Sequence, residues 1–512
     1  MLIVDVLFVN ASSSGMAFQG LSEKYSAIET PTWALLLAES CRSKGFCVGI
    51  LDAEAERLDD LAVLERISSL KPAFVCFVVY GGSPNAGTTC MIGATRTASK
   101  LPSSCTTIFV GSHVSALPKD ILTLSYVDIV LTNEGVYALH HLLDLFKSKP
   151  LSWLEDLKDI KGIGWKDKEK IVINDYSNVV PQERMDIDLP GYAWDLLPFK
   201  NKPLDLYRAH YWHANFDDEK RTPFAAIYTS LGCVHACGFC MINILNRTSG
   251  NDNVSSADSR FMRFWSLEWV NRELLKLKEL NVKTVKFSDE LFFYDSKRYL
   301  PILNSLKSID HSFNIWCYAR VDTVRSKDLA MFKEAGINWL CLGIESANRL
   351  VRKEISKGSF QDIKIEEVVR DIQSNGIFVL GNYILGLPYD SLQSMQETLQ
   401  LSLDMPTEHA NFYTCVALPG SPLYVESKAN GISLPGVDEF EKFAFLSYDH
   451  EPLPSEFCSS SEILEFRDSA WKYYFSNPKY LNFVEERLGP AAKENITKMA
   501  SVVLKRRLLE NS

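Results

Sequence analysis

Residues 231–240 read Leu-Gly-Cys-Val-His-Ala-Cys-Gly-Phe-Cys, a C-x3-C-x2-C pattern formed by Cys233, Cys237 and Cys240. The pattern comes directly after a strand predicted at 224–230. Thiolates are the usual ligands of iron–sulfur clusters, and a four-iron cubane normally takes four of them. Three cysteines therefore leave one iron with an open coordination position, which is what distinguishes a catalytic metal site from a closed structural one.

A structural zinc site is the alternative use of these thiols. Its fourth ligand would be a histidine such as His235, His210 or His213. A closed zinc site would more naturally show paired C-x2-C or H-x3-H ligand spacing. The pattern therefore favours an iron–sulfur cluster.

Strands and helices alternate from this pattern onward. Six β/α units in series predict a barrel or open barrel, in which the chemistry belongs at the carboxyl ends of the strands. We expect the barrel to span 221–425 and a helical C-terminal cap to follow at 426–512. The predicted strands are 224–230, 284–287, 314–318, 339–344, 377–384 and 409–418, and the predicted helices between them are 267–280, 297–309, 326–335, 363–375 and 391–403.

Upstream of the barrel, short β-branched runs alternate with amphipathic stretches, which predicts a doubly wound, Rossmann-like parallel sheet over 1–148. Ligands of such sheets bind outside the carboxyl ends of the strands, although the small residues found there also suit tight turns. No G-x-G-x-x-G follows the first strand, so a dinucleotide is disfavoured. A linker with a hairpin is expected at 149–220. The five predicted strands are 2–9, 47–51, 73–79, 106–110 and 127–131.

The composition is that of an ordinary soluble globular protein. The 512 residues are 46% hydrophobic and 23% charged, with a formal net charge of −10, which argues against a nucleic-acid partner because such a protein needs a basic stripe. No apolar run approaches the roughly 20 residues that span a bilayer, and the apolar N-terminus is predicted to be a strand rather than a signal peptide. The 12 cysteines then suggest a reducing compartment, and we expect a cytoplasmic location.

With Phe239 before the last cysteine, the loop reads C-x3-C-x-aromatic-C and resembles the cluster motif of the radical S-adenosylmethionine (SAM) enzymes. The resemblance implies that Cys233, Cys237 and Cys240 hold a 4Fe–4S cluster whose remaining iron binds the amino and carboxylate groups of SAM. It further implies reductive cleavage of SAM to a 5′-deoxyadenosyl radical, with electrons from an external donor such as flavodoxin or ferredoxin.

Later barrel strands resemble the other SAM contacts of that family. Ser288-Asp289-Glu290 stands where the family often has Gly-Gly-Glu, and Asn382 replaces the first glycine of a G-x-I-x-G element that flanks adenine. Arg320 and Glu345 stand where polar contacts to SAM are common, although each could be half of an ordinary ion pair. The residues assigned to SAM by this resemblance are Phe239, Ser288, Asp289, Glu290, Arg320, Glu345, Ile384 and Gly386.

Joined to such a barrel, the upstream sheet resembles the cobalamin domain of the B12-binding radical SAM enzymes, and the combined resemblance covers 1–425. No D-x-H-x-x-G follows the first strand, which implies base-off cobalamin without a protein imidazole on cobalt; His113 is interpreted as a turn cap. The residues assigned to cobalamin are Tyr80, Gly81, Gly111, Ser112, His113, Asn133, Glu134 and Gly135.

The family resemblance implies a methyltransferase that moves a methyl group from methylcobalamin to an unactivated carbon of a small-molecule substrate. The same cofactors could instead drive a rearrangement, cyclisation or oxidation without methyl transfer. An RNA methylthiotransferase would need a basic module and further cluster cysteines, and a non-catalytic cobalamin carrier would not need the intact cysteine spacing. Candidate substrate walls, or interdomain packing residues, are Tyr207, Arg208, His210, Trp212, His213 and Tyr413.

Overall fold

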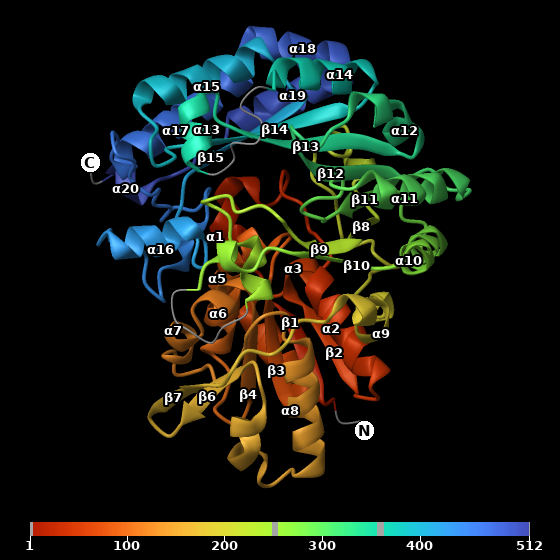
Figure 1. The fold of residues 1–512 in the computed structure, drawn as a ribbon, viewed down its shortest axis with the longest axis vertical. Coiled ribbons are helices and arrows are strands. Elements are labelled where there is room, and N and C mark those ends of the chain that lie inside the picture. The colour runs from red at the N-terminus through yellow and green to blue at the C-terminus, as the bar shows by residue number, and fades with distance from the viewer. Residues whose placement is uncertain (1–3, 248–253, 356–362, 511–512) are drawn as a thin grey trace.

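The computed structural model describes residues 4–247, 254–355 and 363–510. It contains two parallel sheets and a short antiparallel ribbon between them (Figure 1). The N-terminal sheet, coloured red to orange, lies at one end of the molecule, and the second sheet with its helices, coloured green to blue, lies at the other. The predicted fold class, a Rossmann-like sheet followed by an open barrel and a helical C-terminal region, is confirmed.

The N-terminal sheet begins with the five predicted strands, which are all parallel. They are β1 Val6–Asn10, β2 Val48–Asp52, β3 Phe74–Val79, β4 Thr106–Gly111 and β5 Ile129–Leu131, in the order β2-β1-β3-β4-β5. Helices cover both faces: α2 Thr32–Ser43 and α8 Val136–Ser148 on one, α4 Asp60–Leu70, α5 Gly87–Ala98 and α7 Pro118–Leu122 on the other. Because both faces are buried, the strands read as continuous apolar runs.

The predicted hairpin extends this sheet instead of standing apart in the linker. Its strands are β6 Ile163–Asp167 and β7 Lys170–Ile173, and β6 pairs antiparallel with β5. The seven-stranded order is β2-β1-β3-β4-β5-β6-β7. Gly164 lies opposite Val130 in this register, where a Cβ would come within 2.9 Å of the Val130 side chain. The hairpin therefore shields what would otherwise be an exposed strand edge.

The second sheet is the open barrel. Its six parallel strands are β8 Phe224–Ile227, β11 Thr284–Phe287, β12 Asn314–Arg320, β13 Ile337–Glu345, β14 Phe378–Leu385 and β15 His409–Thr414. Consecutive strands pair in chain order, with β8 and β15 at the two edges. The intervening helices, α10 Leu267–Glu279, α11 Ser296–Ser308, α12 Leu329–Glu334, α14 Ile365–Ser374 and α15 Leu392–Asp404, lie on the outer side (Figure 1).

Two short strands that the sequence did not reveal frame the cysteine loop. β9 Ser230–Gly232 pairs antiparallel with β10 Met262–Phe264. The segment that carries the three cysteines therefore starts at one strand of a two-stranded ribbon, and the chain returns at the other. Gly232 has φ +88, and a Cβ there would lie 2.3 Å from the Phe261 carbonyl oxygen. Only glycine fits this position without strain, which fixes the point where the loop begins.

The C-terminal region is helical from Ser460 onward, whereas residues 430–459, which lie inside the predicted helical cap, form only a short 3-10 turn at Phe440–Phe443. It comprises α16 Pro422–Ala429, α17 Ser460–Ser476, α18 Pro478–Leu488, α19 Pro490–Ala500 and α20 Arg507–Glu510, and α17 packs on β15. Of the tail aromatics, Tyr474, Phe475 and Tyr480 are buried, whereas Tyr473 is exposed. Among the described helices, none combines the length and the apolar character needed to cross a bilayer.

Candidate active site

The cysteine loop is held to the barrel by hydrogen bonds on both sides. The Cys233 amide donates to Asn243 Oδ1 at 3.0 Å, and Asn243 Nδ2 returns a bond to the Cys233 carbonyl at 2.8 Å. Further along, the Gly238 amide donates to the Ile355 carbonyl, and the Leu423 amide donates to the Gly238 carbonyl, both at 2.9 Å. These contacts fix the loop backbone at the mouth of the barrel.

Each of the three sulfurs has a nitrogen donor beside it. The His235 amide lies 3.4 Å from Cys233 Sγ, and Arg320 Nη1 lies 3.7 Å from Cys237 Sγ. Asn85 Nδ2, from the N-terminal domain, lies 3.6 Å from Cys240 Sγ. Burial raises the pKa of Cys233 to about 12 and also raises that of Cys240. Thiols in such surroundings ionise only when a metal replaces the proton, and donors at the sulfurs suit a thiolate-bound cluster.

The zinc alternative gains no support from the geometry. Among the described residues, no three His, Cys, Asp or Glu side chains are gathered to hold one metal ion. His213 Nε2 lies 3.0 Å from the Asn314 carbonyl oxygen, and His210 Nε2 lies 3.6 Å from a Glu29 oxygen. A four-iron cluster separates its ligands more widely than a single ion does, since each thiolate binds a different iron.

The three residues after β11 have different surroundings. Asp289 is internal: it accepts hydrogen bonds from the Thr229 amide at 2.9 Å, the Thr229 hydroxyl at 2.7 Å and the Ser230 hydroxyl at 2.5 Å. Ser288 Oγ and Glu290 Oε2, in contrast, are buried without a hydrogen-bond partner. Burial raises the pKa of Glu290 to about 8. The Glu290 carboxyl therefore suits a cationic partner supplied by a ligand, such as the amino group of SAM.

The remaining residues assigned to SAM lie on the later strands. Arg320 makes a two-point ion pair with Asp322, both contacts at 2.9 Å, so the ion-pair alternative holds for one side of its guanidinium. Glu345 ends β13 with φ +66, a conformation that is uncommon for residues other than glycine. Ile384 and Phe239 belong to one apolar cluster. At Gly386 a Cβ would lie 2.5 Å from Ile463 of α17, so close packing already requires a glycine there.

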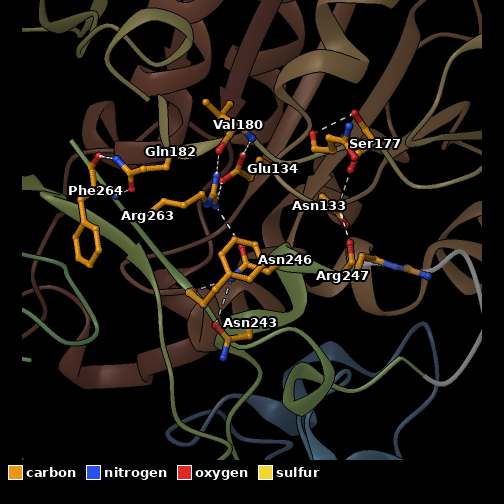
Figure 2. Close-up of polar contacts among 12 residues, drawn as sticks. Asn133, Glu134, Ser177, Val180, Gln182, Asn243, Asn246, Arg247, Arg263 and Phe264 are labelled. Carbon is orange, nitrogen blue, oxygen red and sulfur yellow. Dashed lines mark hydrogen bonds and ion pairs between the residues drawn. The ribbon is translucent and has the colours of Figure 1, made fainter. Parts of the chain in front are cut away.

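At the N-terminal sheet, three of the residues assigned to cobalamin are engaged with the rest of the chain, and Figure 2 shows two of them, Asn133 and Glu134. Glu134 accepts a hydrogen bond from the Val180 amide at 2.9 Å and pairs with Arg263 of β10. Asn133 Nδ2 donates to the Ser177 and Arg247 carbonyls at 2.8 and 3.1 Å. Tyr80 donates to the Asn133 carbonyl at 3.0 Å. This edge of the sheet is therefore tied to the barrel, although Asn133 Oδ1 is buried without a partner.

The other residues assigned to cobalamin are close-packed. His113 Nδ1 lies 3.1 Å from the Thr88 hydroxyl, and burial lowers the pKa of His113 to about 3, so it is packed between elements rather than capping a turn. A Cβ at Gly111 would lie 2.1 Å from the Val79 carbonyl oxygen, and one at Gly135 would lie 2.7 Å from Val110. Gly81, with φ +65, is exposed, and Ser112 is buried.

Comparisons with known proteins agree with this architecture. A radical SAM superfamily model matches residues 227–402. An uncharacterized methyltransferase of Pyrococcus horikoshii is 27% identical over 397 residues, which are 76% of each chain. An anaerobic magnesium-protoporphyrin IX monomethyl ester cyclase of Rubrivivax gelatinosus is 23% identical over 467 residues, 88% of this chain and 75% of the relative.

The fold is also similar to that of OxsB, a cobalamin-dependent SAM radical enzyme solved with aqua-cobalamin and SAM bound. The TM-score is 0.63 at 15% identity, and the match covers 97% of this chain and 70% of that one. This chain carries a radical SAM domain at residues 227–402, and over most of its length it is similar in fold to a cobalamin-dependent radical SAM enzyme. It is an enzyme of the radical SAM class, and the cofactors of the family are a 4Fe–4S cluster, SAM and cobalamin.

Sequence reasoning missed the residues through which this radical SAM enzyme joins its two domains. Lys286 of β11 is buried, pairs with Glu29 at 2.8 Å, donates to the Gly82 carbonyl at 2.8 Å and lies 4.9 Å from the Trp316 ring centre. Burial alone would raise the pKa of Glu29, but Lys286 and His210 lower it to about 2. A buried lysine inside a strand was the only sequence signal, because its partners lie more than 200 residues away.

The candidate wall residues contact different parts of the chain. Tyr207 donates to Asp52 at 2.9 Å, Arg208 donates to the Ser22 carbonyl at 3.0 Å, and Trp212 contacts the rings of Trp316 and Trp339. Tyr413 packs beside Phe445. A cavity of about 800 Å³ opens beside the Glu134–Arg263 pair, with Tyr137, Tyr176, Asn246, Arg247, Phe261 and Arg263 among its lining residues.

Proposed function

We propose that this enzyme transfers a methyl group to an unactivated carbon of a small-molecule substrate. The observation that carries the proposal is the contact between the cluster loop and the carboxyl edge of the N-terminal sheet. Asn85, six residues after β3, accepts a hydrogen bond from the Met241 amide at 3.0 Å, and Met241 follows the last loop cysteine. The two proposed cofactor edges therefore meet, as they must if a substrate radical formed beside SAM is to take a methyl group from cobalamin.

The proposed roles follow from the surroundings of each group. The cluster would be held by Cys233, Cys237 and Cys240. The Glu290 carboxylate would bind the amino group of SAM through a charge-assisted hydrogen bond. When bound, these cofactors and cobalamin supply a 5′-deoxyadenosyl radical and a methyl group. Asp289 holds the residues just before Cys233 in place through three hydrogen bonds, so the protein's contribution is to position the groups and exclude water.

The barrel interior offers further groups to a substrate. Tyr228 Oη and Trp316 Nε1 are buried without a hydrogen-bond partner. Tyr228 directly follows β8, the strand that pairs with β11, and the Trp316 ring lies 4.9 Å from Lys286 Nζ. Buried polar atoms of this kind are costly unless a ligand or water pairs with them. They therefore support a substrate with hydrogen-bonding groups. The 800 Å³ cavity beside the Glu134–Arg263 pair also has the size of small-molecule sites, although neither Tyr228 nor Trp316 is among its lining residues.

On the cobalamin side, we propose the edge formed by Tyr80, Gly81, residues 111–113 and residues 133–135. The His113 ring is engaged with Thr88, which supports the proposal that no protein imidazole binds cobalt. The domain boundaries 1–148, 149–220, 221–425 and 426–512 belong to the same proposal. So do an external electron donor such as flavodoxin or ferredoxin and a cytoplasmic location.

The test is turnover with SAM that carries a deuterated methyl group, using anaerobically reconstituted enzyme with cobalamin and candidate substrates. We expect a product that is heavier by the labelled methyl group, together with 5′-deoxyadenosine and S-adenosylhomocysteine. Turnover that yields deoxyadenosine and an unlabelled product, without S-adenosylhomocysteine, would refute methyl transfer.

A second candidate is cyclisation or oxidation with the same cofactors and no methyl transfer. The cyclase from Rubrivivax gelatinosus, which aligns with most of this chain, favours it. The labelled SAM experiment separates the two functions, because only methyl transfer consumes a second SAM as a methyl donor.

A further inference from the structure

The loop after β3, residues 81–86, carries the N-terminal domain to the cluster loop. Gly81 has φ +65, and a Cβ there would lie 2.8 Å from Ala86 Cβ, so the two ends of the loop almost touch. The Ala86 amide donates to the Ser83 carbonyl at 2.9 Å and closes the turn. The Gly82 carbonyl accepts from Lys286 Nζ at 2.8 Å and ties the loop to the barrel. The tip that carries Asn85 is therefore fixed from both domains.

The orientation of the Asn85 amide follows from its partners. The Met241 amide can only donate, and it lies 3.0 Å from Asn85 Oδ1. This contact assigns the oxygen and leaves the Nδ2 group facing Cys240 Sγ at 3.6 Å. In the thiol form Cys240 can donate to Oδ1, from which it lies 3.8 Å. A metal-bound thiolate has no proton to donate, so it can only accept from Nδ2.

We infer that Asn85 is a positioning residue that donates a hydrogen bond from the N-terminal domain to the Cys240 thiolate and thereby raises the reduction potential of the cluster. The inference rests on the proposed cluster site. Reduction adds negative charge that is partly carried by the sulfurs, and an N–H donor stabilises that charge. The described donors to the other two sulfurs, the His235 amide and Arg320, both come from the barrel. Cys240 is thus the sulfur through which the cobalamin-binding domain contacts the cluster.

The experiment is a potentiometric titration of the anaerobically reconstituted holoenzyme, followed by the EPR signal of the reduced cluster. Asn85→Asp keeps the acceptor for the Met241 amide, removes the donor and adds a negative charge; Asn85→Ala removes both hydrogen bonds. We expect a lower potential than wild type for Asn85→Ala and a still lower one for Asn85→Asp, at unchanged iron and sulfide content. Ser83→Ala, in the same loop, is the matched control and should keep the wild-type potential.

A second measurement does not depend on how the variants fold. Electron–nuclear double resonance of the reduced wild-type cluster should show an exchangeable proton coupling that is assigned to Asn85 by selective ¹⁵N-asparagine labelling. Wild-type potentials in both Asn85 variants, or the absence of any asparagine coupling in the wild-type cluster, would overturn the inference. Wild-type protein that binds no iron and sulfide would instead overturn the proposed cluster, so the two failures are distinguishable.

Discussion

The two parallel sheets present their carboxyl ends to each other, but they treat the polar groups there differently. At the barrel, Ser288 Oγ, Glu290 Oε2 and Tyr228 Oη are buried without partners. At the N-terminal sheet, Glu134 and Tyr80 have partners within the chain. The barrel end therefore has polar atoms that can hydrogen-bond to a ligand. At the N-terminal edge, most of the polar groups already hydrogen-bond to other parts of the chain.

The largest expected effect removes the barrel's metal ligands. Replacing Cys233, Cys237 and Cys240 together with alanine should abolish cluster absorbance and deoxyadenosine formation, because the iron then has no protein thiolate. Cobalamin binding should persist, since the N-terminal sheet is untouched. Absorbance spectra, iron and sulfide analysis and product chromatography measure these effects. Deoxyadenosine formation at the wild-type rate would end the radical SAM assignment of this loop.

The second prediction concerns the buried ion pair between Glu134 of the N-terminal domain and Arg263 of β10. Arg263→Met leaves the Glu134 carboxylate buried without its cationic partner, and both side chains of the pair are at most 4% exposed. Breaking such a buried pair costs about 3–5 kcal/mol of unfolding free energy. Urea unfolding measures the loss, with Lys307→Met as the control, because Lys307 pairs with Glu334 on the surface and surface pairs contribute about 0–1 kcal/mol.

The double variant Glu134→Gln/Arg263→Met sharpens this comparison. It removes both charges, so it should be less destabilised than the sum of the two single variants. If the double variant loses as much unfolding free energy as the two single variants together, the two side chains act independently and their ion pair does not hold the domains together.

The sequence predicted the elements of both edges well because each strand is a continuous apolar run. The strand predicted at 284–287 is β11, and the one predicted at 106–110 is β4 less its last residue. The cysteine loop was equally readable, since its chemistry lies within ten residues. The ribbon β9–β10 was missed because a strand of three residues has too few positions to show a period.

The contacts between the edges could not be predicted for a different reason. Asn85 meets residues 155 and 156 positions later, Glu134 meets Arg263 across 129 positions, and Glu29 meets Lys286 across 257. Local patterning does not encode which strand ends will face each other after the domains dock. The residues assigned to cobalamin were therefore named from motif positions, and their engagement with the barrel became visible only in three dimensions.

The third prediction tests a buried carboxyl at the N-terminal edge. Burial raises the pKa of Asp52 to about 6, well above the usual range of an aspartate, despite hydrogen bonds from Asn10, Tyr207 and the Ala55 amide. The folded state therefore holds a proton that the unfolded chain releases between about pH 4 and 6. Stability from this group is full below pH 4 and falls as the pH rises to 6, by at most about 3 kcal/mol.

Asp52→Asn should remove this dependence, so that the unfolding free energy of the variant improves relative to wild type as the pH rises from 4 to 7. Urea unfolding at several pH values measures the difference. Asp59→Asn, at the exposed N-cap of α4, is the matched control for loss of an N-cap carboxylate. A difference between Asp52→Asn and wild type that is constant with pH would show that Asp52 titrates alike in both states.

The smallest expected effect returns to the barrel edge. Glu290→Gln keeps the shape of the side chain and replaces a carboxylate with a neutral amide. A hydrogen bond to a charged group contributes about 1 kcal/mol more than a neutral one, so SAM should bind roughly fivefold more weakly. Equilibrium dialysis with the cluster-loaded protein measures the affinity.

Glu279→Gln, at the exposed end of α10, is the control for removal of one negative charge from the barrel. Unchanged SAM affinity in Glu290→Gln would mean that the unpartnered Oε2 atom does not receive the amino group. The contrast between the edges would then rest on Ser288 and Tyr228, whose hydroxyls can bind neutral groups but cannot compensate a cation. Weaker binding in Glu290→Gln, with unchanged binding in Glu279→Gln, would instead show that the Glu290 carboxylate binds SAM. The carboxylate of the N-terminal edge, Glu134, is by contrast already paired within the chain.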